Sequence, residues 1–124
     1  MSTNETRLNL IRLHLAASII AAKEMKREAT VTIMSTSPEA SQYKEACATL
    51  SIMSYVHSYL EPLKVFAANS DYIGTVDILR YHADRLSEKL PPESDDPSDI
   101  GRHGVNFILN DILNKAAQLT AIAS

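Results

Sequence analysis

The sequence predicts an all-α fold, a mostly antiparallel four-helix bundle in which residues 1–124 form a single domain. Two observations lead to this prediction. Apolar residues recur at spacings of three and four through four long segments, which is the period of a helix that buries one side. Aromatic residues make up only 6% of the chain and there are three glycines, which is little material for a β-sandwich. The 45% of apolar residues suffices for one hydrophobic core.

The first helix is expected at residues 4–34. Ser2 and Glu5 have the spacing of a capping box, so the helix is expected to begin at once. Its apolar residues form two stripes on roughly opposite sides. One stripe contains Leu8, Ile11, Leu15, Ala22 and Met25, and the other contains Leu10, Leu13, Ala17 and Ile20. The β-branched run at residues 30–33 disfavours helix locally, so a loop or a short strand at residues 29–36 is the alternative.

The second helix is expected at residues 38–61, with Ser37 as its N-cap and Pro38 in its first turn. Apolar side chains at mixed spacings of four and three support it. Proline disfavours helical angles at the residue before it, so this helix is expected to end or kink at Pro62.

The third and fourth helices are separated by an acidic loop. The third is expected at residues 71–90, where Asp71 can act as the N-cap and Pro91 ends the helix. The loop covers residues 91–101, and the fourth helix is expected at residues 102–123. Apolar seams of mixed three and four spacing favour crossing angles near about 20°, as in bundles.

None of the strong sequence motifs of catalysis or metal binding occurs in the chain. There is no phosphate-binding glycine-rich loop, no paired-cysteine zinc motif and no nucleophile elbow. A di-metal bundle needs Glu-x-x-His, and no glutamate lies three residues before any of the four histidines. We therefore expect a non-enzyme with no catalytic residues, no metal site and no cofactor, although one histidine would suffice to ligate haem.

Two histidines would be the general base if the protein were an enzyme. His57 lies on the apolar side of the second helix, and we interpret it as a core-edge histidine with a hydrogen-bond partner. A role as a buried ligand is the alternative. His82 lies beside charged residues that we interpret as a solvated helix face.

The second apolar stripe of the first helix exceeds what one core requires. A helix that is apolar on two sides either lies inside a core or contacts a core and a partner together. We therefore expect Leu10, Leu13, Ala17 and Ile20 to form a partner-binding surface. The predicted function is a non-catalytic protein–protein interaction module, a small homodimeric regulator, adaptor or inhibitor of another protein.

An alternative function depends on the expected start of the fourth helix. Arg102 and His103 lie there between two glycines, and two positive groups at a helix start oppose the helix dipole. Backbone N–H groups near glycines can approach an anion closely. A small-ligand or anion-binding bundle anchored by Arg102 and His103 is therefore the alternative, unless the acidic loop supplies the compensating charge.

Charge and hydropathy restrict the remaining partner classes. The formal net charge is −3, which disfavours nucleic acid as a partner. The uncharged run at residues 13–22 is about half the length of a membrane span, so no membrane association is expected. Cys47 is the only cysteine, and an unpaired thiol is typical of a reducing compartment, so we expect a cytoplasmic protein.

Overall fold

The computed structural model describes residues 3–92 and 95–123, with side chains of the last helix described through residue 118. Within these residues the chain forms four helices and no strand. They are α1 (Thr3–Ser35), α2 (Ser41–Ala68), α3 (Tyr72–Lys89) and α4 (Pro97–Ala123). The predicted all-α class is therefore confirmed, and the packing of the helices is that of a bundle.

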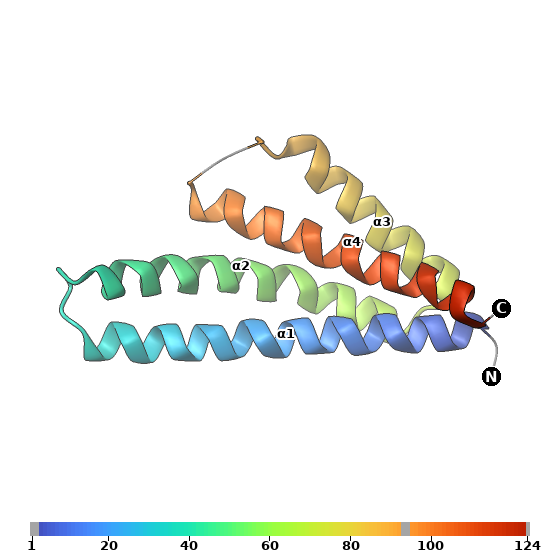
Figure 1. Cartoon of the computed structure of the whole chain (residues 1–124), viewed down its shortest axis with the longest axis horizontal. Helices are drawn as coiled ribbons and strands as arrows, with labels where there is room; N and C mark the ends of the chain where they lie inside the picture. Colours follow the sequence, from blue (N-terminus) through green and yellow to red (C-terminus); the bar gives the residue numbers. More distant parts are fainter. Residues whose placement is uncertain (1–2, 93–94, 124) are drawn as a thin grey trace.

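The arrangement of the bundle is uneven along its length. Consecutive helices run in opposite directions, and α1 and α2 form a long hairpin (Figure 1). α4 packs against this hairpin, and α3 packs mainly against α4 rather than against α1 or α2. The end of the hairpin that contains the α1–α2 connection extends past α3 and α4 (Figure 1). The core is consequently concentrated where all four helices meet.

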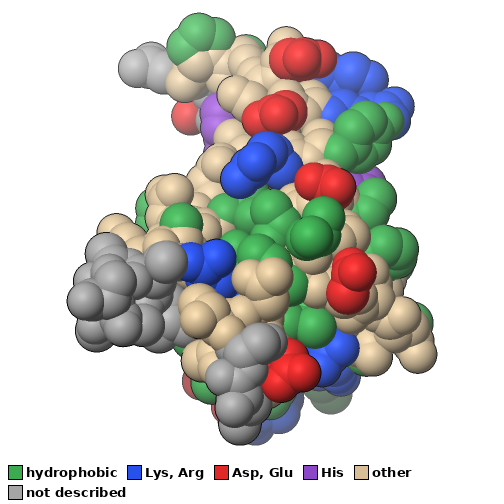
Figure 2. Space-filling view, turned by 90° about the vertical axis from the view of Figure 1, so that its right-hand side faces the viewer, with side chains coloured by type: hydrophobic (Ala, Val, Ile, Leu, Met, Phe, Trp, Pro, Cys, Tyr) green, Lys and Arg blue, Asp and Glu red, His purple; other side chains and the backbone are tan. Residues whose placement is uncertain are grey.

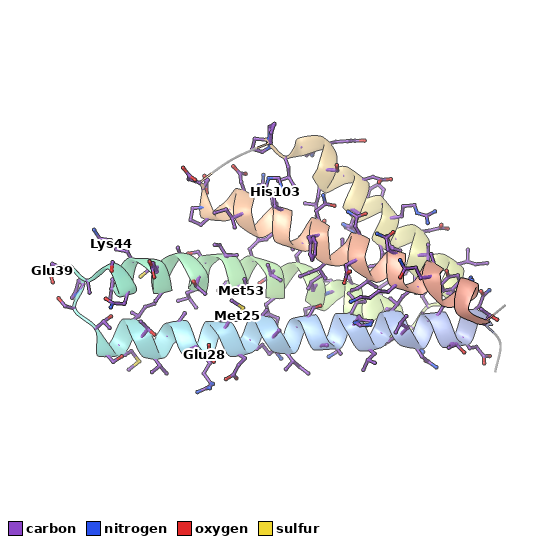
Figure 3. The ribbon with its side chains drawn as sticks, viewed as in Figure 1. Met25, Glu28, Glu39, Lys44, Met53 and His103 are labelled. Atoms are coloured by element: carbon purple, nitrogen blue, oxygen red, sulfur yellow. The ribbon has the colours of Figure 1, made fainter. Side chains whose placement is uncertain are left out.

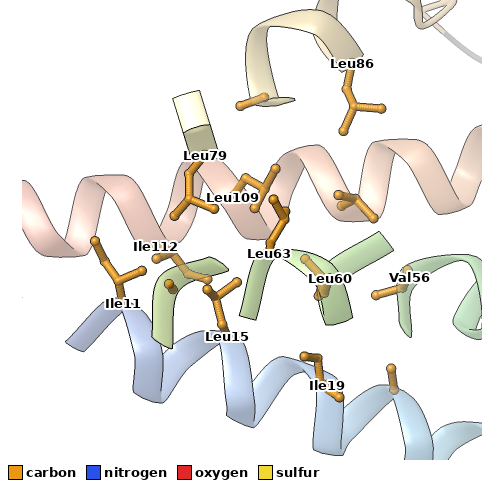
Figure 4. Close-up of a cluster of buried hydrophobic side chains, with 14 of the residues drawn as sticks. Ile11, Leu15, Ile19, Val56, Leu60, Leu63, Leu79, Leu86, Leu109 and Ile112 are labelled. Carbon is orange, nitrogen blue, oxygen red and sulfur yellow. The ribbon is translucent and has the colours of Figure 1, made fainter. Parts of the chain in front are cut away.

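The core consists of aliphatic side chains from every helix (Figure 4). Ile11, Leu15, Leu60, Leu79 and Leu109 are fully buried. Burial of such a side chain contributes about 1.5–3 kcal/mol relative to its exposure to water. The first predicted stripe of α1 thus packs in the core, except that Met25 is 43% exposed. Gly101 allows α4 to approach α2 closely, since a Cβ there would lie 3.0 Å from the Tyr55 ring.

The start of α2 differs from the prediction. The helix begins at Ser41 and not at Pro38, and its N-cap residue is Ala40, which has no side-chain cap. The Ala40 N–H donates to the Ser37 carbonyl oxygen at 2.9 Å, so Pro38 and Glu39 occupy a turn. Ser37 therefore closes this turn and is not the N-cap.

The end of α2 also differs from the prediction. Pro62 lies inside the helix, which continues to Ala68, so an end at Pro62 is excluded and a kink there stays a prediction. The buried residues Leu63 and Ala67 explain the continuation, because both pack in the core beyond the proline. Packing of this kind offsets the free-energy cost of the helical hydrogen bond that is lost because proline has no N–H.

A long-range contact fastens the end of α2 to α1. The Arg12 Nε–H donates to the Ala67 carbonyl oxygen at 2.8 Å, and its Nη2 donates to the Ser70 carbonyl oxygen at 3.3 Å. The last carbonyls of a helix lack partners within the helix, and a cation there also favours the helix dipole. Arg12 therefore acts as a C-terminal cap supplied by a different helix.

The start of α4 lies upstream of the predicted position. The helix begins at Pro97, more than one turn before Arg102. The Asp96 carboxylate accepts a hydrogen bond from the Ser98 N–H at 2.9 Å, and proline is favoured in the first turn of a helix. The predicted loop at residues 91–101 is therefore too long at its C-terminal end.

Candidate functional site

The second predicted stripe of α1 lies on the surface of the bundle, opposite the core. We call these four residues the α1 outer face: Leu10, Leu13, Ala17 and Ile20. Leu13 is 65% exposed and Ile20 is 66% exposed, Ala17 is exposed, and Leu10 is half-buried. No helix within the described residues covers Leu13 or Ile20. Most of the second apolar stripe is thus not buried in the core of one chain.

Polar residues mark the limit of the α1 outer face toward the hairpin connection. The next turn carries an exposed ion pair in which Arg27 donates to the Glu24 carboxylate. Beyond this pair, Val31 and Met34 are again exposed. The α1 outer face is therefore an apolar surface about 15 Å long, since its residues span ten rises of the helix.

A separate apolar cavity lies where the start of α4 leaves the α1–α2 hairpin. Its volume is about 320 Å³. Met25 and Met53 lie toward one another between α1 and α2 (Figure 3), and both line the cavity. The rest of the lining consists of Ser18, Ala21, Ala22, Ile52, Val56, Ile100, Gly104 and Ile108. We call this cavity the methionine cleft.

The sequence reasoning did not identify the methionine cleft. Met25 belongs to the first apolar stripe of α1, yet the structure leaves it 43% exposed, with Ile100 39% exposed. The small residues Ala21, Ala22 and Gly104 leave room that larger side chains would fill. Such residues are common in helices, so their presence alone is a weak signal of a cavity.

A further hydrophobic area lies at the end of the bundle opposite the α1–α2 connection. Figure 2 shows hydrophobic side chains at the centre of this end, with charged side chains of both signs around them. A shallow hollow there is lined by Leu8, Tyr72 and Ile73 together with polar residues. The Arg7 guanidinium lies 5.5 Å from the centre of the Tyr72 ring. This stacking fastens the start of α1 to the start of α3.

His57 is half-buried and has a hydrogen-bond partner on each ring nitrogen. The Lys26 Nζ donates to Nδ1 at 3.2 Å, and the Nε2–H donates to the Glu61 carboxylate at 3.2 Å. Both nitrogens are thus used by the protein. This arrangement agrees with the interpretation of His57 as a core-edge histidine that links α1 to α2.

His82 has a different environment from the one expected. Its Nδ1 lies 2.7 Å from the Tyr59 hydroxyl, and the two rings meet edge to face. Burial lowers the pKa of His82 below its ordinary value of 6.5, and the positive charge of Arg85 lowers it further. Burial, and then Tyr55, raise the pKa of the Tyr59 hydroxyl. At neutral pH the Tyr59 O–H therefore donates to an uncharged His82.

The two predicted anion-binding residues, Arg102 and His103, contact different parts of the protein. The His103 Nε2–H donates to the Pro91 carbonyl oxygen at 3.0 Å, which ties α4 to the end of α3. Arg102 is exposed, and its Nη1 lies 3.7 Å from the Asp99 carboxylate. Both residues lie inside α4, where the backbone N–H groups are engaged in the helix. The structure therefore does not provide the helix-start anion site that the alternative function requires.

The described side chains contain no group of three or more His, Cys, Asp or Glu residues that could hold a metal ion. Within the same part of the chain, no helix has an apolar stretch long enough to cross a bilayer.

No family model, no curated protein and no solved structure matches the chain. The function proposed below therefore depends on the surfaces and cavities of this chain alone.

Proposed function

We propose that this chain is a non-catalytic protein–protein interaction module, a homodimer paired through the α1 outer face that regulates another protein. The observation that carries the proposal is the exposure of Leu13 and Ile20. These two large aliphatic side chains lie on the side of α1 that faces away from the core. The free energy falls when a partner removes apolar surface of this kind from water, so the surface favours association.

The α1 outer face is suited to pairing with a second copy of itself. In an antiparallel pair centred between Ala16 and Ala17, Leu13 of one copy lies beside Ile20 of the other. The small alanines at the centre allow two helices to approach closely. One patch that is complementary to itself is what a twofold symmetric dimer requires.

The polar borders of the α1 outer face are compatible with the same pairing. Glu24 then lies near Asn9 of the other copy, and Arg27 lies near Thr6, so no like charges face each other. Lys23 lies near Leu10, which the aliphatic stem of a lysine can cover. Pairing in this register therefore buries the apolar residues and leaves the ion pair at the rim.

The methionine cleft is the proposed anchor site for the regulated protein. Its volume of about 320 Å³ suits one or two apolar side chains of a partner. Methionine is flexible and polarisable, so Met25 and Met53 can adapt to such an anchor. Interfaces of this type gain most of their affinity from a few side chains buried in pockets.

The proposed location is the cytoplasm. The single cysteine, Cys47, is half-buried and unpaired, which suits a reducing compartment.

The test of the proposed dimer is a pair of substitutions on the α1 outer face. Leu13→Asp and Ile20→Asp should each weaken dimerisation by about 100-fold or more, because each places an unpaired carboxylate in the interface. Helical content by circular dichroism should be unchanged, since both positions are exposed in the monomer. Sedimentation equilibrium measures the dissociation constant.

The matched control is Val31→Asp on the same helix. Val31 is 55% exposed but lies beyond the Glu24–Arg27 ion pair, so this variant should dimerise like the parent. Equal weakening by all three substitutions would show that the α1 outer face is not the contact. Unfolding of the Leu13 and Ile20 variants would show that both side chains contribute to the core.

A further inference from the structure

A cleft lined by basic side chains lies between α2, α3 and α4. Its volume is about 350 Å³, within the usual range of about 300–1,000 Å³ for small-molecule sites. The residues that line it are Tyr59, His82, Arg85, Leu86, Lys89 and Arg102. We call this cavity the basic cleft. Of the described residues that line the cleft, none is a carboxylate, although acidic residues outnumber basic ones in the whole chain.

The described part of the chain compensates the positive charges of the basic cleft poorly. Among the residues that the structure describes, neither Arg85 nor Lys89 forms an ion pair with a carboxylate, and Arg85 instead donates to the Tyr81 hydroxyl at 2.9 Å. Arg102 lies 3.7 Å from Asp99, which is long for a charge-assisted hydrogen bond. Arg85 and Lys89 are four residues apart on α3, a spacing at which like charges repel. A bound anion would relieve this repulsion.

The Tyr59–His82 pair adds a neutral donor to the cleft. When His82 is uncharged, Tyr59 donates to Nδ1 and the Nε2–H remains as a donor. When His82 is protonated, Nδ1–H donates to the Tyr59 oxygen, and the Tyr59 O–H becomes available. The pair therefore keeps a donor in either state, and protonation adds a positive charge.

The number of these groups favours a phosphate over a carboxylate. A carboxylate has two oxygens, and one guanidinium can satisfy both. Two guanidinium groups and an ammonium that reach one cavity from two helices suit a group with more oxygens and a charge near −2. Tyr59 and Leu86 supply apolar surface beside the charges, which inorganic phosphate alone would not use.

We propose that the basic cleft binds a small organic phosphate, with the phosphate held by Arg85, Lys89 and Arg102 and the organic part packed on Tyr59 and Leu86. The site is independent of the proposed dimer, because none of these residues belongs to α1. It also differs from the helix-start site predicted from sequence, since it includes Arg102 but not His103 and uses side chains from three helices.

Calorimetric titration of the full chain with phenyl phosphate tests the proposal. Phenyl phosphate should bind saturably and about tenfold more tightly than inorganic phosphate, because its ring adds buried apolar area. Phenol is the control for the organic part, and equal binding of phenol would overturn the proposal. Absence of saturable binding of phenyl phosphate would overturn it as well.

Arginine substitutions locate the site. Arg85→Gln and Arg102→Gln should each weaken phenyl phosphate binding about tenfold, the cost of one charge-assisted contact in a partly solvated cleft. Arg80→Gln removes the same charge from an exposed position of α3 outside the cleft, and it should change affinity less than twofold. Equal weakening by all three variants would show that only the general field of the protein attracts the ligand, and would overturn the proposal.

The pKa of His82 provides a test of the site in the unsubstituted protein. Its neighbours in the cleft are Tyr59, Arg85, Lys89 and Arg102, with Tyr81 against its other side. Bound phosphate should raise the pKa of His82, because a nearby negative charge stabilises the protonated ring. Ring signals in nuclear magnetic resonance spectra measure this change. Binding that leaves the His82 signals and pKa unchanged would place the ligand elsewhere and overturn the proposal.

Discussion

At the scale of single residues, Thr75 is the most unusual member of the core. It is fully buried on α3, and its hydroxyl oxygen has no hydrogen-bond partner. A buried hydroxyl without a partner costs about 1–3 kcal/mol relative to one that is solvated. Its presence among leucines and isoleucines therefore lowers the stability of the bundle.

Thr75→Val should raise the free energy of unfolding by about 1 kcal/mol. Valine has nearly the same shape and the same β-branch, so the substitution removes the unsatisfied hydroxyl and little else. Urea denaturation measures the change. Thr30→Val is the matched control, because the Thr30 hydroxyl is exposed and donates to the Lys26 carbonyl oxygen, and it should change stability little. Loss of stability in Thr75→Val would show that the hydroxyl is satisfied in solution.

His82 should make the stability of the fold depend on pH. The pKa of His82 is lowered in the folded protein, so the unfolded chain binds the proton more readily. The contribution is therefore fully present above the ordinary pKa of 6.5 and is lost as pH falls through that value toward the lowered one. Urea denaturation in phosphate-free buffer between about pH 5 and pH 8 measures this slope.

His82→Gln should remove the part of the slope that His82 contributes. The same substitution at His14, which belongs to α1, should keep that part and serves as the control. An unchanged slope in His82→Gln would show that the Tyr59–His82 pair does not disfavour protonation.

At the scale of helices, Arg12 links α1 to the end of α2, a contact that the sequence alone does not reveal. Its two hydrogen bonds reach carbonyl oxygens more than fifty residues away in the chain. Arg12→Ala should lower the free energy of unfolding by about 1–2 kcal/mol, because it leaves the end of α2 without its cap. Thermal denaturation measures the loss. Arg27→Ala removes an exposed ion pair on the same helix and should lower the thermal stability much less, because exposed ion pairs contribute little. Equal losses would contradict the capping role.

The helices themselves could be predicted from periodicity, and the ends of α1 and α3 to within one residue, but the ends of α2 and the start of α4 could not. The α1 helix follows its apolar period through the β-branched run, and the structure extends it to Ser35. Pro62 does not end α2 because Leu63 and Ala67 bury their side chains beyond it, and burial depends on tertiary packing. The start of α4 had a readable signal in Asp96 and Pro97, which lies inside the acidic run that the prediction assigned to the loop.

The same limit applies to the candidate sites. The period of α1 correctly placed Leu13 and Ile20 opposite the core. His82, Arg85 and Lys89 share one side of α3 by their spacing, so their common face was readable. Their meeting with Tyr59 and Arg102 depends on the packing of α2 and α4 against α3, which spacing within one helix cannot show. The methionine cleft likewise arises from the divergence of α4 from the hairpin.

At the scale of the whole molecule, three separate surfaces have proposed occupants. The α1 outer face is assigned to a second copy, the methionine cleft to another protein and the basic cleft to an organic phosphate. The α1 outer face and the basic cleft share no residue, so each assignment can fail without the other. The dimer is the central claim, because it explains why one helix is apolar on two sides.

Solution mass by light scattering over a range of concentrations tests this claim most directly. The proposed dimer predicts a mass of twice the 13.7 kDa of one chain, which falls toward that of the monomer only on dilution. A mass of 13.7 kDa at every concentration would contradict the claim that the α1 outer face pairs two copies.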